Sequence, residues 1–146
     1  MSKKPMPEKR ICSTSHERKL IDRIFMIHEK QIIKGKIPSK SNCYKIVTLH
    51  GHGSLAKQKI LKEYEKSFYL QCSLRDAKIK GFFKLSADVY HENMRPDLDN
   101  AFKILLDCLQ SCKAINNDRQ CVEINARKLV DKDNPRVEFL IEEVEL

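Results

Sequence analysis

The chain has 146 residues, enough for one domain with a modest core. Hydrophobic residues make up 41% and charged residues 33%, and no apolar stretch approaches the roughly 20 residues that span a membrane. The formal net charge is +8, but residues 1–80 hold 19 Lys or Arg against 7 Asp or Glu, whereas residues 81–146 hold 9 against 13. A basic part attracts phosphates and an acidic part can hold divalent cations, so an enzyme that acts on nucleic acid fits this pattern. A lysine-rich solvated surface is the simpler alternative.

The N-terminus is basic and no apolar segment follows it, so we expect no secretory signal and a cytoplasmic protein. Reduced, partly buried thiols are the expected state of the cysteines in that compartment. Their irregular spacing completes no tetrahedral zinc set, which argues against the alternative of a zinc site. The six cysteines are Cys12, Cys43, Cys72, Cys108, Cys112 and Cys121.

Residues 1–30 are expected to form a basic arm and an amphipathic helix, and residues 31–146 the folded domain. Thr14 and Glu17 have capping-box spacing, and apolar residues then recur with helical period, which predicts a helix over 15–29. A strand over 30–37 is predicted to end at Pro38, and an extended run to end at Leu49.

The segment 50–53 is predicted to be a glycine-rich turn. Its histidines, His50 and His52, are either metal ligands or part of an exposed loop that faces DNA, and the turn favours the loop. A helix is expected from Ser54, as N-cap, to about Cys72. Its apolar face carries Ile60, Leu61, Tyr64 and Phe68. Another face carries Lys59, Lys62 and Lys66, which are either solvated or in contact with phosphates.

The second half of the chain has the clearest periodicity. Residues 79–90 alternate with period two, which predicts a half-buried strand whose apolar side holds Phe83, Leu85, Ala87 and Val89. Residues 98–113 return to helical spacing, with an apolar stripe of Leu98, Ala101, Phe102, Leu105, Leu109 and Cys112. Strands are expected again around 122–126 and, after a turn at 133–135, around 137–141. These elements predict an α+β domain with a mixed sheet of about four strands, two main helices and the N-terminal helix.

The segment 95–103 carries the candidate chemistry. Pro96 marks a helix boundary, Asp97 is a natural N-cap, and Asp99 and Lys103 follow on the first turns. Acidic residues are common at helix starts for electrostatic reasons alone, so two of them do not make a site. The third acid, Asp118, precedes a strand. If folding brings Asp118 beside the other two, three carboxylates make an oxygen site suited to Mg²⁺ or Mn²⁺.

Asp97-Leu98-Asp99-Asn100-x-x-Lys103, followed after fourteen residues by Asp118-x-Gln120, resembles the active-site signature of the RusA-type Holliday junction resolvases. The resemblance covers about residues 31–144. It extends to the Pro-, Ser- and Asn-containing segment 36–44, the predicted helix of 54–68, and the strand segments near 127 and 134–138. Three features depart from the family pattern: Asn117 stands where many members carry an acid, the loop 113–117 lacks glycine, and residues 1–30 have no counterpart in compact members.

The resemblance implies a homodimeric endonuclease that nicks four-way DNA junctions symmetrically, with Mg²⁺ or Mn²⁺ as cofactor, in DNA recombination and repair. It implies metal binding by Asp97, Asp99 and Asp118, and assistance to the transition state by Lys103. By residue type and position, the candidate DNA contacts are Lys40, Lys45, His52, Lys59, Lys62, Lys66, Arg95 and Arg127. A nucleic-acid-binding module without useful catalysis, and a nuclease that prefers flaps or forks, are the alternatives.

Overall fold

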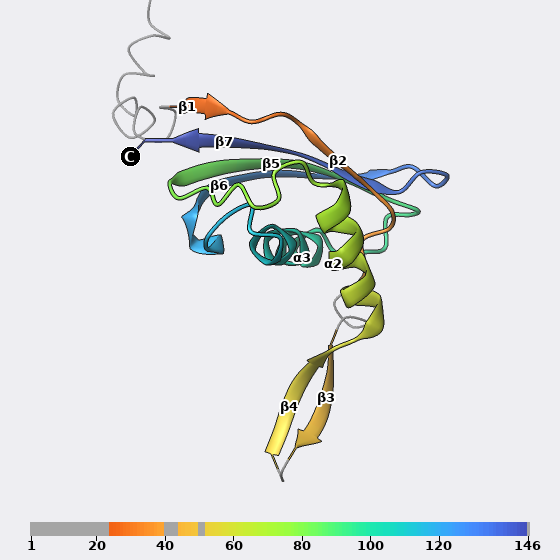
Figure 1. Ribbon diagram of the computed structural model, residues 1–146. Helices are drawn as coiled ribbons and strands as arrows, with labels where there is room; N and C mark the ends of the chain where they lie inside the picture. The colour runs from red at the N-terminus through yellow and green to blue at the C-terminus, as the bar shows by residue number, and fades with distance from the viewer. Residues whose placement is uncertain (1–23, 40–43, 50–51, 146) are drawn as a thin grey trace, which may run out of the picture.

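The computed structural model describes residues 24–39, 44–49 and 52–145. Its sheet has the order β1-β7-β5-β6, and β2 also pairs with β7. These strands are β1 Ile24–Ile27, β2 Gln31–Lys34, β5 Phe82–His91, β6 Cys121–Val130 and β7 Arg136–Val144. Helices α2 (Lys59–Gln71) and α3 (Leu98–Ser111) lie on one side of the sheet, and the hairpin of β3 (Tyr44–Leu49) and β4 (His52–Lys57) projects away from it (Figure 1). The predicted α+β class with a mixed sheet is therefore confirmed.

The core lies between the sheet and the two helices. The alternate residues of β5 predicted to be apolar are all buried, and Val137, Phe139 and Ile141 of β7 meet them from the neighbouring strand. Phe139 stacks on Phe68 of α2, with ring centroids 5.9 Å apart and planes 7° from parallel. The period-two pattern of the sequence thus marks the side of the sheet that the helices cover.

The unit that positions the site is β5-α3-β6. β5 and β6 are parallel, with Leu85 opposite Ile124 and Val89 opposite Lys128. Because parallel neighbours start at the same end of the sheet, the chain must return from the end of β5 to the beginning of β6, and α3 provides this return. The start of α3 therefore belongs to one end of the sheet and the start of β6 to the other.

Two predicted helix segments are wrong. The helix expected over 15–29 is contradicted at Ile24–Ile27, which forms β1 and pairs antiparallel with β7; residues 15–23 lie outside the described part. The helix expected from Ser54 begins only at Lys59, because residues 52–57 form β4 opposite β3. Both segments are short runs that can adopt either state, and a strand partner far along the chain or across a hairpin decides the outcome.

None of the cysteines among the described residues forms a disulfide, as predicted: Cys72, Cys108 and Cys112 are buried and Cys121 is half-buried. Cys12 and Cys43 lie outside the described residues. Between residues 24 and 145, no helix that the structure describes is long and apolar enough to cross a membrane.

Candidate functional site

Asp97 and Asp99 stand where α3 begins. Asp97 is the N-cap residue, with extended backbone (φ −82°, ψ 139°), but its carboxylate accepts no capping hydrogen bond from the described backbone. Asp99 lies in the first turn, and its Oδ1 accepts the N–H of Asn100 at 2.9 Å. Both side chains are exposed and lie beside the partial positive charge of the helix start. The Asp97 carboxylate is thus held at a helix start without being used as a cap.

A surface hollow opens beside these two carboxylates. Asp97, Asp99, Asn100 and Lys103 form part of its wall, with Ser39, Arg95 and Pro96. Asn100 Oδ1 is buried and meets no hydrogen-bond partner among the described residues. An acceptor left in this state costs about 1–3 kcal/mol, so a ligand that it could contact would be favoured. Two carboxylates and an amide oxygen are the donors that Mg²⁺ and Mn²⁺ prefer, and the residues present fit such an ion.

The loop before α3 is tied to the sheet by Lys128. Its Nζ donates to the carbonyl oxygens of Met94 and Pro96, both at 2.9 Å. Within the loop, Asn93 Oδ1 accepts the N–H of Arg95 at 2.9 Å. Lys128 lies on β6, thirty-two residues after Pro96, and nothing in the local sequence pairs the two. It is a positioning residue that sequence reasoning missed.

Lys103 connects this hollow to a second acidic group. Its Nζ lies 3.3 Å from Asp107 Oδ1 and 3.6 Å from Asp118 Oδ2. The hydrogen bond and the charge of Asp107, and then the charge of Asp118, raise the pKa of Lys103 above its ordinary value, so the ammonium stays charged. Asp107 was also missed by the sequence reasoning. Its spacing of four residues after Lys103 on a helix is the signal that could have found it.

Asp118 begins a short 3-10 turn, η2 (Asp118–Gln120), that is held from several sides. Asn117 caps the turn by accepting the N–H of Arg119 at 3.0 Å, while Gln120 Oε1 accepts the N–H of Asn117 at 2.6 Å. Gln110 Oε1 on α3 accepts the N–H of Asp118 at 3.1 Å. The departure at Asn117 therefore has a structural use, because its amide supplies the cap of the turn that presents Asp118.

The buried side chain of Gln120 anchors this turn to the chain before β5. Its Nε2 donates to the carbonyl oxygens of Ile79 and Gly81, both at 2.8 Å. The spacing Asp118-x-Gln120 thus combines an exposed carboxylate with a buried amide. The amide fixes where the carboxylate lies.

The structure does not gather the three predicted metal ligands into one cluster within a chain. Asp97 and Asp99 lie at the start of α3, whereas Asp118 lies beside its later turns, next to Asp107 and Gln110. No three His, Cys, Asp or Glu residues of the described part are close enough together to hold one ion. Lys103 is the residue common to both groups.

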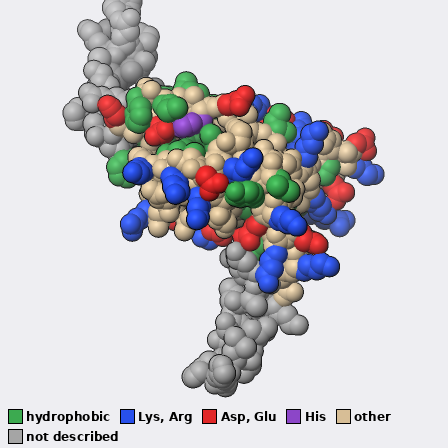
Figure 2. All heavy atoms as spheres, in the orientation of Figure 1, with side chains coloured by type: hydrophobic (Ala, Val, Ile, Leu, Met, Phe, Trp, Pro, Cys, Tyr) green, Lys and Arg blue, Asp and Glu red, His purple; other side chains and the backbone are tan. Residues whose placement is uncertain are grey.

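The candidate DNA contacts occupy several places. Lys59, Lys62 and Lys66 are exposed along α2, and basic side chains are prominent on this face of the molecule (Figure 2). Arg95 is exposed at the hollow beside Asp97. Lys45 lies on β3 and His52 on β4, in the projecting hairpin, and Lys40 and His50 lie outside the described residues.

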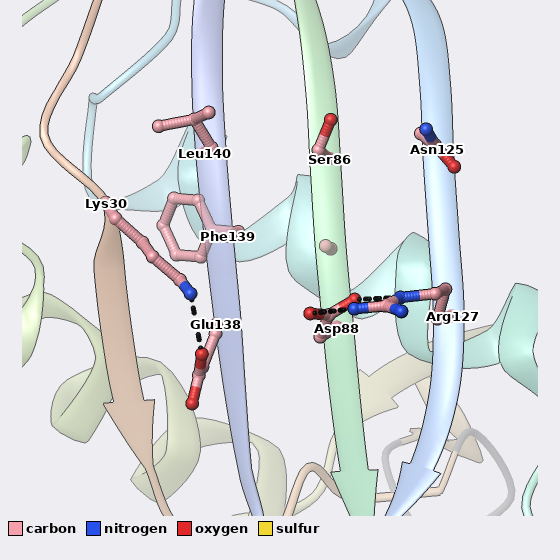
Figure 3. A pocket seen from close by; sticks show the side chains of 9 residues that line it. Lys30, Ser86, Asp88, Asn125, Arg127, Glu138, Phe139 and Leu140 are labelled. Atoms are coloured by element: carbon pink, nitrogen blue, oxygen red, sulfur yellow. Dashed lines mark hydrogen bonds and ion pairs between the residues drawn. The ribbon is translucent and has the colours of Figure 1, made fainter.

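Arg127 lies elsewhere, on the sheet face opposite the helices. Its Nε and one terminal nitrogen donate to the two carboxylate oxygens of Asp88, at 2.8 and 2.9 Å (Figure 3). The bond to Arg127 lowers the pKa of Asp88, so this pair is ionised. A hollow on that face is also lined by Lys30 and Glu138, which pair at 2.8 Å. These charges neutralise one another, so this hollow is a weaker candidate than the one beside Asp97.

The family model of the endodeoxyribonuclease RusA matches residues 37–142. The chain belongs to the RusA family. The matched region contains the hollow beside Asp97, the Lys103 bridge and the turn at Asp118, together with α2, α3 and almost all of β5, β6 and β7. A search of curated proteins finds no match. Membership makes the chain an endodeoxyribonuclease of the family that resolves Holliday junctions and acts on branched DNA, as the motif indicated.

Proposed function

We propose that this RusA-family chain is a homodimeric, Mg²⁺- or Mn²⁺-dependent endonuclease that cuts four-way DNA junctions symmetrically in recombination and repair. The observation that carries the proposal is the hollow lined by the carboxylates of Asp97 and Asp99 and by Asn100, whose buried side-chain oxygen has no hydrogen-bond partner among the described residues. These oxygens would hold the cation. When bound, it would polarise the scissile phosphodiester and lower the pKa of the attacking water.

Lys103 has a separate task in this proposal. Its ammonium lies close to two carboxylates that raise its pKa, so as a cation it can compensate the negative charge that grows on the phosphate during attack. Asp118 belongs to the proposal because Lys103, which lines the hollow, also forms an ion pair with it. A phosphate that draws Lys103 toward the hollow would release Asp118 from its ion pair.

A two-fold assembly follows from the substrate. A four-way junction has two related strands to cut, and a two-fold dimer supplies two related sites. The exposed lysines of α2 and Arg95 beside the hollow would hold the phosphate backbone, and this binding would weaken as salt rises.

The decisive experiment compares a synthetic four-way junction with a linear duplex, in Mg²⁺, in Mn²⁺ and without metal. We expect paired, symmetric nicks in the junction only when metal is present. Asp99→Asn should abolish nicking and leave junction binding intact, because it removes a ligand and not a phosphate contact. Asp133→Asn, an exposed acid in the turn between β6 and β7, is the matched control and should cut normally.

Three results would count against parts of the proposal. Nicking that persists in Asp99→Asn would remove the metal assignment. Binding without nicks in either metal would favour the alternative of a binding module. Cuts in flaps or forks in preference to junctions, without a symmetric pattern, would replace the substrate class while keeping the chemistry.

A further inference from the structure

β6 is a long edge strand whose pairing with β5 is regular from Glu123 onward, after a register shift at its start. It has ten residues, contains neither Pro nor Gly, and pairs on one side with β5, while no strand of the described residues pairs with its other side. Alternate N–H and C=O groups of such a strand point outward, and a long free edge is a template for another strand. Ile124, which faces the helix side, is 45% exposed although it lies in the middle of the strand.

Two charged side chains of β6, both on the sheet face opposite the helices, are paired with side chains of β5. Glu123 lies opposite Lys84, with Oε2 and Nζ 3.7 Å apart, and Arg127 lies opposite Asp88 with two hydrogen bonds. Asn125 stands midway between Glu123 and Arg127 on the same sheet face. Figure 3 shows Asn125 and Arg127 at successive positions along β6, with the Arg127 side chain pointing to Asp88 on the neighbouring strand.

This order is self-complementary about Asn125. When a strand pairs antiparallel with its own copy, residues equally far on either side of the two-fold axis lie opposite each other. An axis at Asn125 therefore places Glu123 of each copy opposite Arg127 of the other. On the helix side it places the exposed Ile124 opposite Ala126. Axes at Glu123 or at Arg127 would instead oppose two like charges.

We propose that β6 pairs antiparallel with β6 of a second copy, in the register centred on Asn125. Charges then alternate across the seam, from Asp88 and Arg127 of one copy to Glu123 and Lys84 of the other. Charged residues usually protect an edge strand from association, but here they select one partner, the same strand of the same protein. This is the interface of the dimer that the proposed function requires. The pairing itself is argued from β6, and only the role of the dimer rests on the proposed function.

The assembly would place both hollows on one side of a continuous sheet. A two-fold axis perpendicular to the sheet leaves the helices of both copies on the same face. The hollows would lie toward opposite ends of the paired strands, because Asp97 follows the end of β5 and the two copies of β6 run in opposite directions. A two-fold substrate can meet two such sites at once.

The first test is a cysteine at the axis. Asn125→Cys should form a disulfide between copies under mild oxidation, because directly opposed residues of antiparallel strands have Cα atoms about 4.5–5.5 Å apart. Ser86→Cys, one strand inward on the same face, is the matched control. Residue 86 of one copy would lie about 15 Å from residue 86 of the other, too far for a disulfide. We expect a covalent dimer on a non-reducing gel for Asn125→Cys alone, with the parent chain and Ser86→Cys uncrosslinked.

The second test uses charge reversal. Glu123→Arg alone and Arg127→Glu alone each place like charges opposite each other twice, and we expect dimerisation measured by sedimentation to weaken by about tenfold or more. An equimolar mixture of the two variants restores both opposite-charge pairs, so dimerisation should return. Each variant keeps the same internal defect alone and in the mixture, and the comparison therefore reports the interface.

Both tests are made without DNA or metal, so they are independent of nuclease activity. A parent chain that sediments as a monomer would overturn the interface. So would a dimer that Asn125→Cys does not crosslink, or single variants that dimerise as well as the parent. A crosslinked dimer without nuclease activity would support the interface while contradicting the proposed function.

Discussion

Lys103 Nζ lies 3.6 Å from Asp118 Oδ2, and this ion pair joins the two halves of the candidate site. The ammonium also contacts Asp107 at 3.3 Å and forms part of the hollow beside Asp97 and Asp99. A cation shared in this way relieves repulsion among carboxylates as long as no divalent ion is bound. The same position suits it to meet a phosphate that enters the hollow.

Replacing Lys103 should therefore affect chemistry more than folding. We expect Lys103→Met to lower the single-turnover cleavage rate by at least about a hundredfold, the size of effect found when one transition-state donor is removed. Its side chain is 58% exposed, so the midpoint of urea unfolding should change little. Lys132→Met, in the exposed turn after β6, is the control and should keep the parent rate. A loss of less than about threefold in Lys103→Met would remove Lys103 from the mechanism.

Asn100 offers a test of the metal site that does not depend on DNA. Removing the buried, unpartnered oxygen with Asn100→Ala should weaken Mn²⁺ binding, measured by calorimetry, by about tenfold or more. Folding stability should not fall by the amount expected for a lost hydrogen bond, because no described residue bonds to that oxygen. Asn134→Ala, in the exposed turn before β7, is the control and should bind Mn²⁺ like the parent. Unchanged affinity in Asn100→Ala would mean that the amide serves the fold alone.

The strongest local patterns of the sequence predicted the elements that carry the motif. Alternation from Phe83 to Val89 and the helical stripe after Asp97 are long enough to identify β5 and α3, and Asp97 takes the N-cap position as expected. The runs at Ile24–Ile27 and His52–Lys57 are too short for a periodic pattern to identify them. Their strand state comes from pairing with β7 and with β3, which no local pattern records.

The candidate site, too, could be predicted only in part from local sequence patterns. The motif places Asp97, Asp99 and Lys103 on one helix start, and local spacing suffices for that. The position of Asp118 depends on how the crossover returns to the sheet. Because β6 is parallel to β5, its beginning lies beside the later turns of α3, and Asp118 meets Lys103 and Gln110 there. Only the three-dimensional path of the chain contains this information.

His91 at the end of β5 should make stability depend on pH. It is buried, and neither ring nitrogen has a partner among the described residues. Burial lowers the pKa of His91, and the charges of Lys128 and Lys36 act in the same direction. As pH falls, His91 of the unfolded chain therefore becomes protonated near the ordinary value of about 6.5. His91 of the folded chain becomes protonated only at a lower pH. The contribution to stability is complete above that pH and is lost as pH falls toward the folded pKa.

The measurement is the free energy of urea unfolding between about pH 7.5 and pH 5. We expect it to fall with pH in the parent chain, and to fall less steeply in His91→Gln, whose amide does not titrate. The substitution breaks no side-chain hydrogen bond of the described structure, so the variant should fold at neutral pH. An identical slope in both proteins would assign the pH dependence to other groups.

Gln110 and Gln120 both hold the turn of Asp118, but only Gln120 is buried. Variants of the two residues should therefore distinguish the effect of positioning Asp118 from the effect on the free energy of unfolding. Gln120→Ala removes the Nε2 bonds to Ile79 and Gly81 and should cost about 1–3 kcal/mol of unfolding free energy. Gln110→Ala removes one exposed acceptor of the Asp118 N–H and should leave unfolding nearly unchanged. Because both changes loosen Asp118, cleavage should slow in each when assayed well below the unfolding temperature. Normal cleavage in both variants would mean that the reaction does not require Asp118 to be held in this turn.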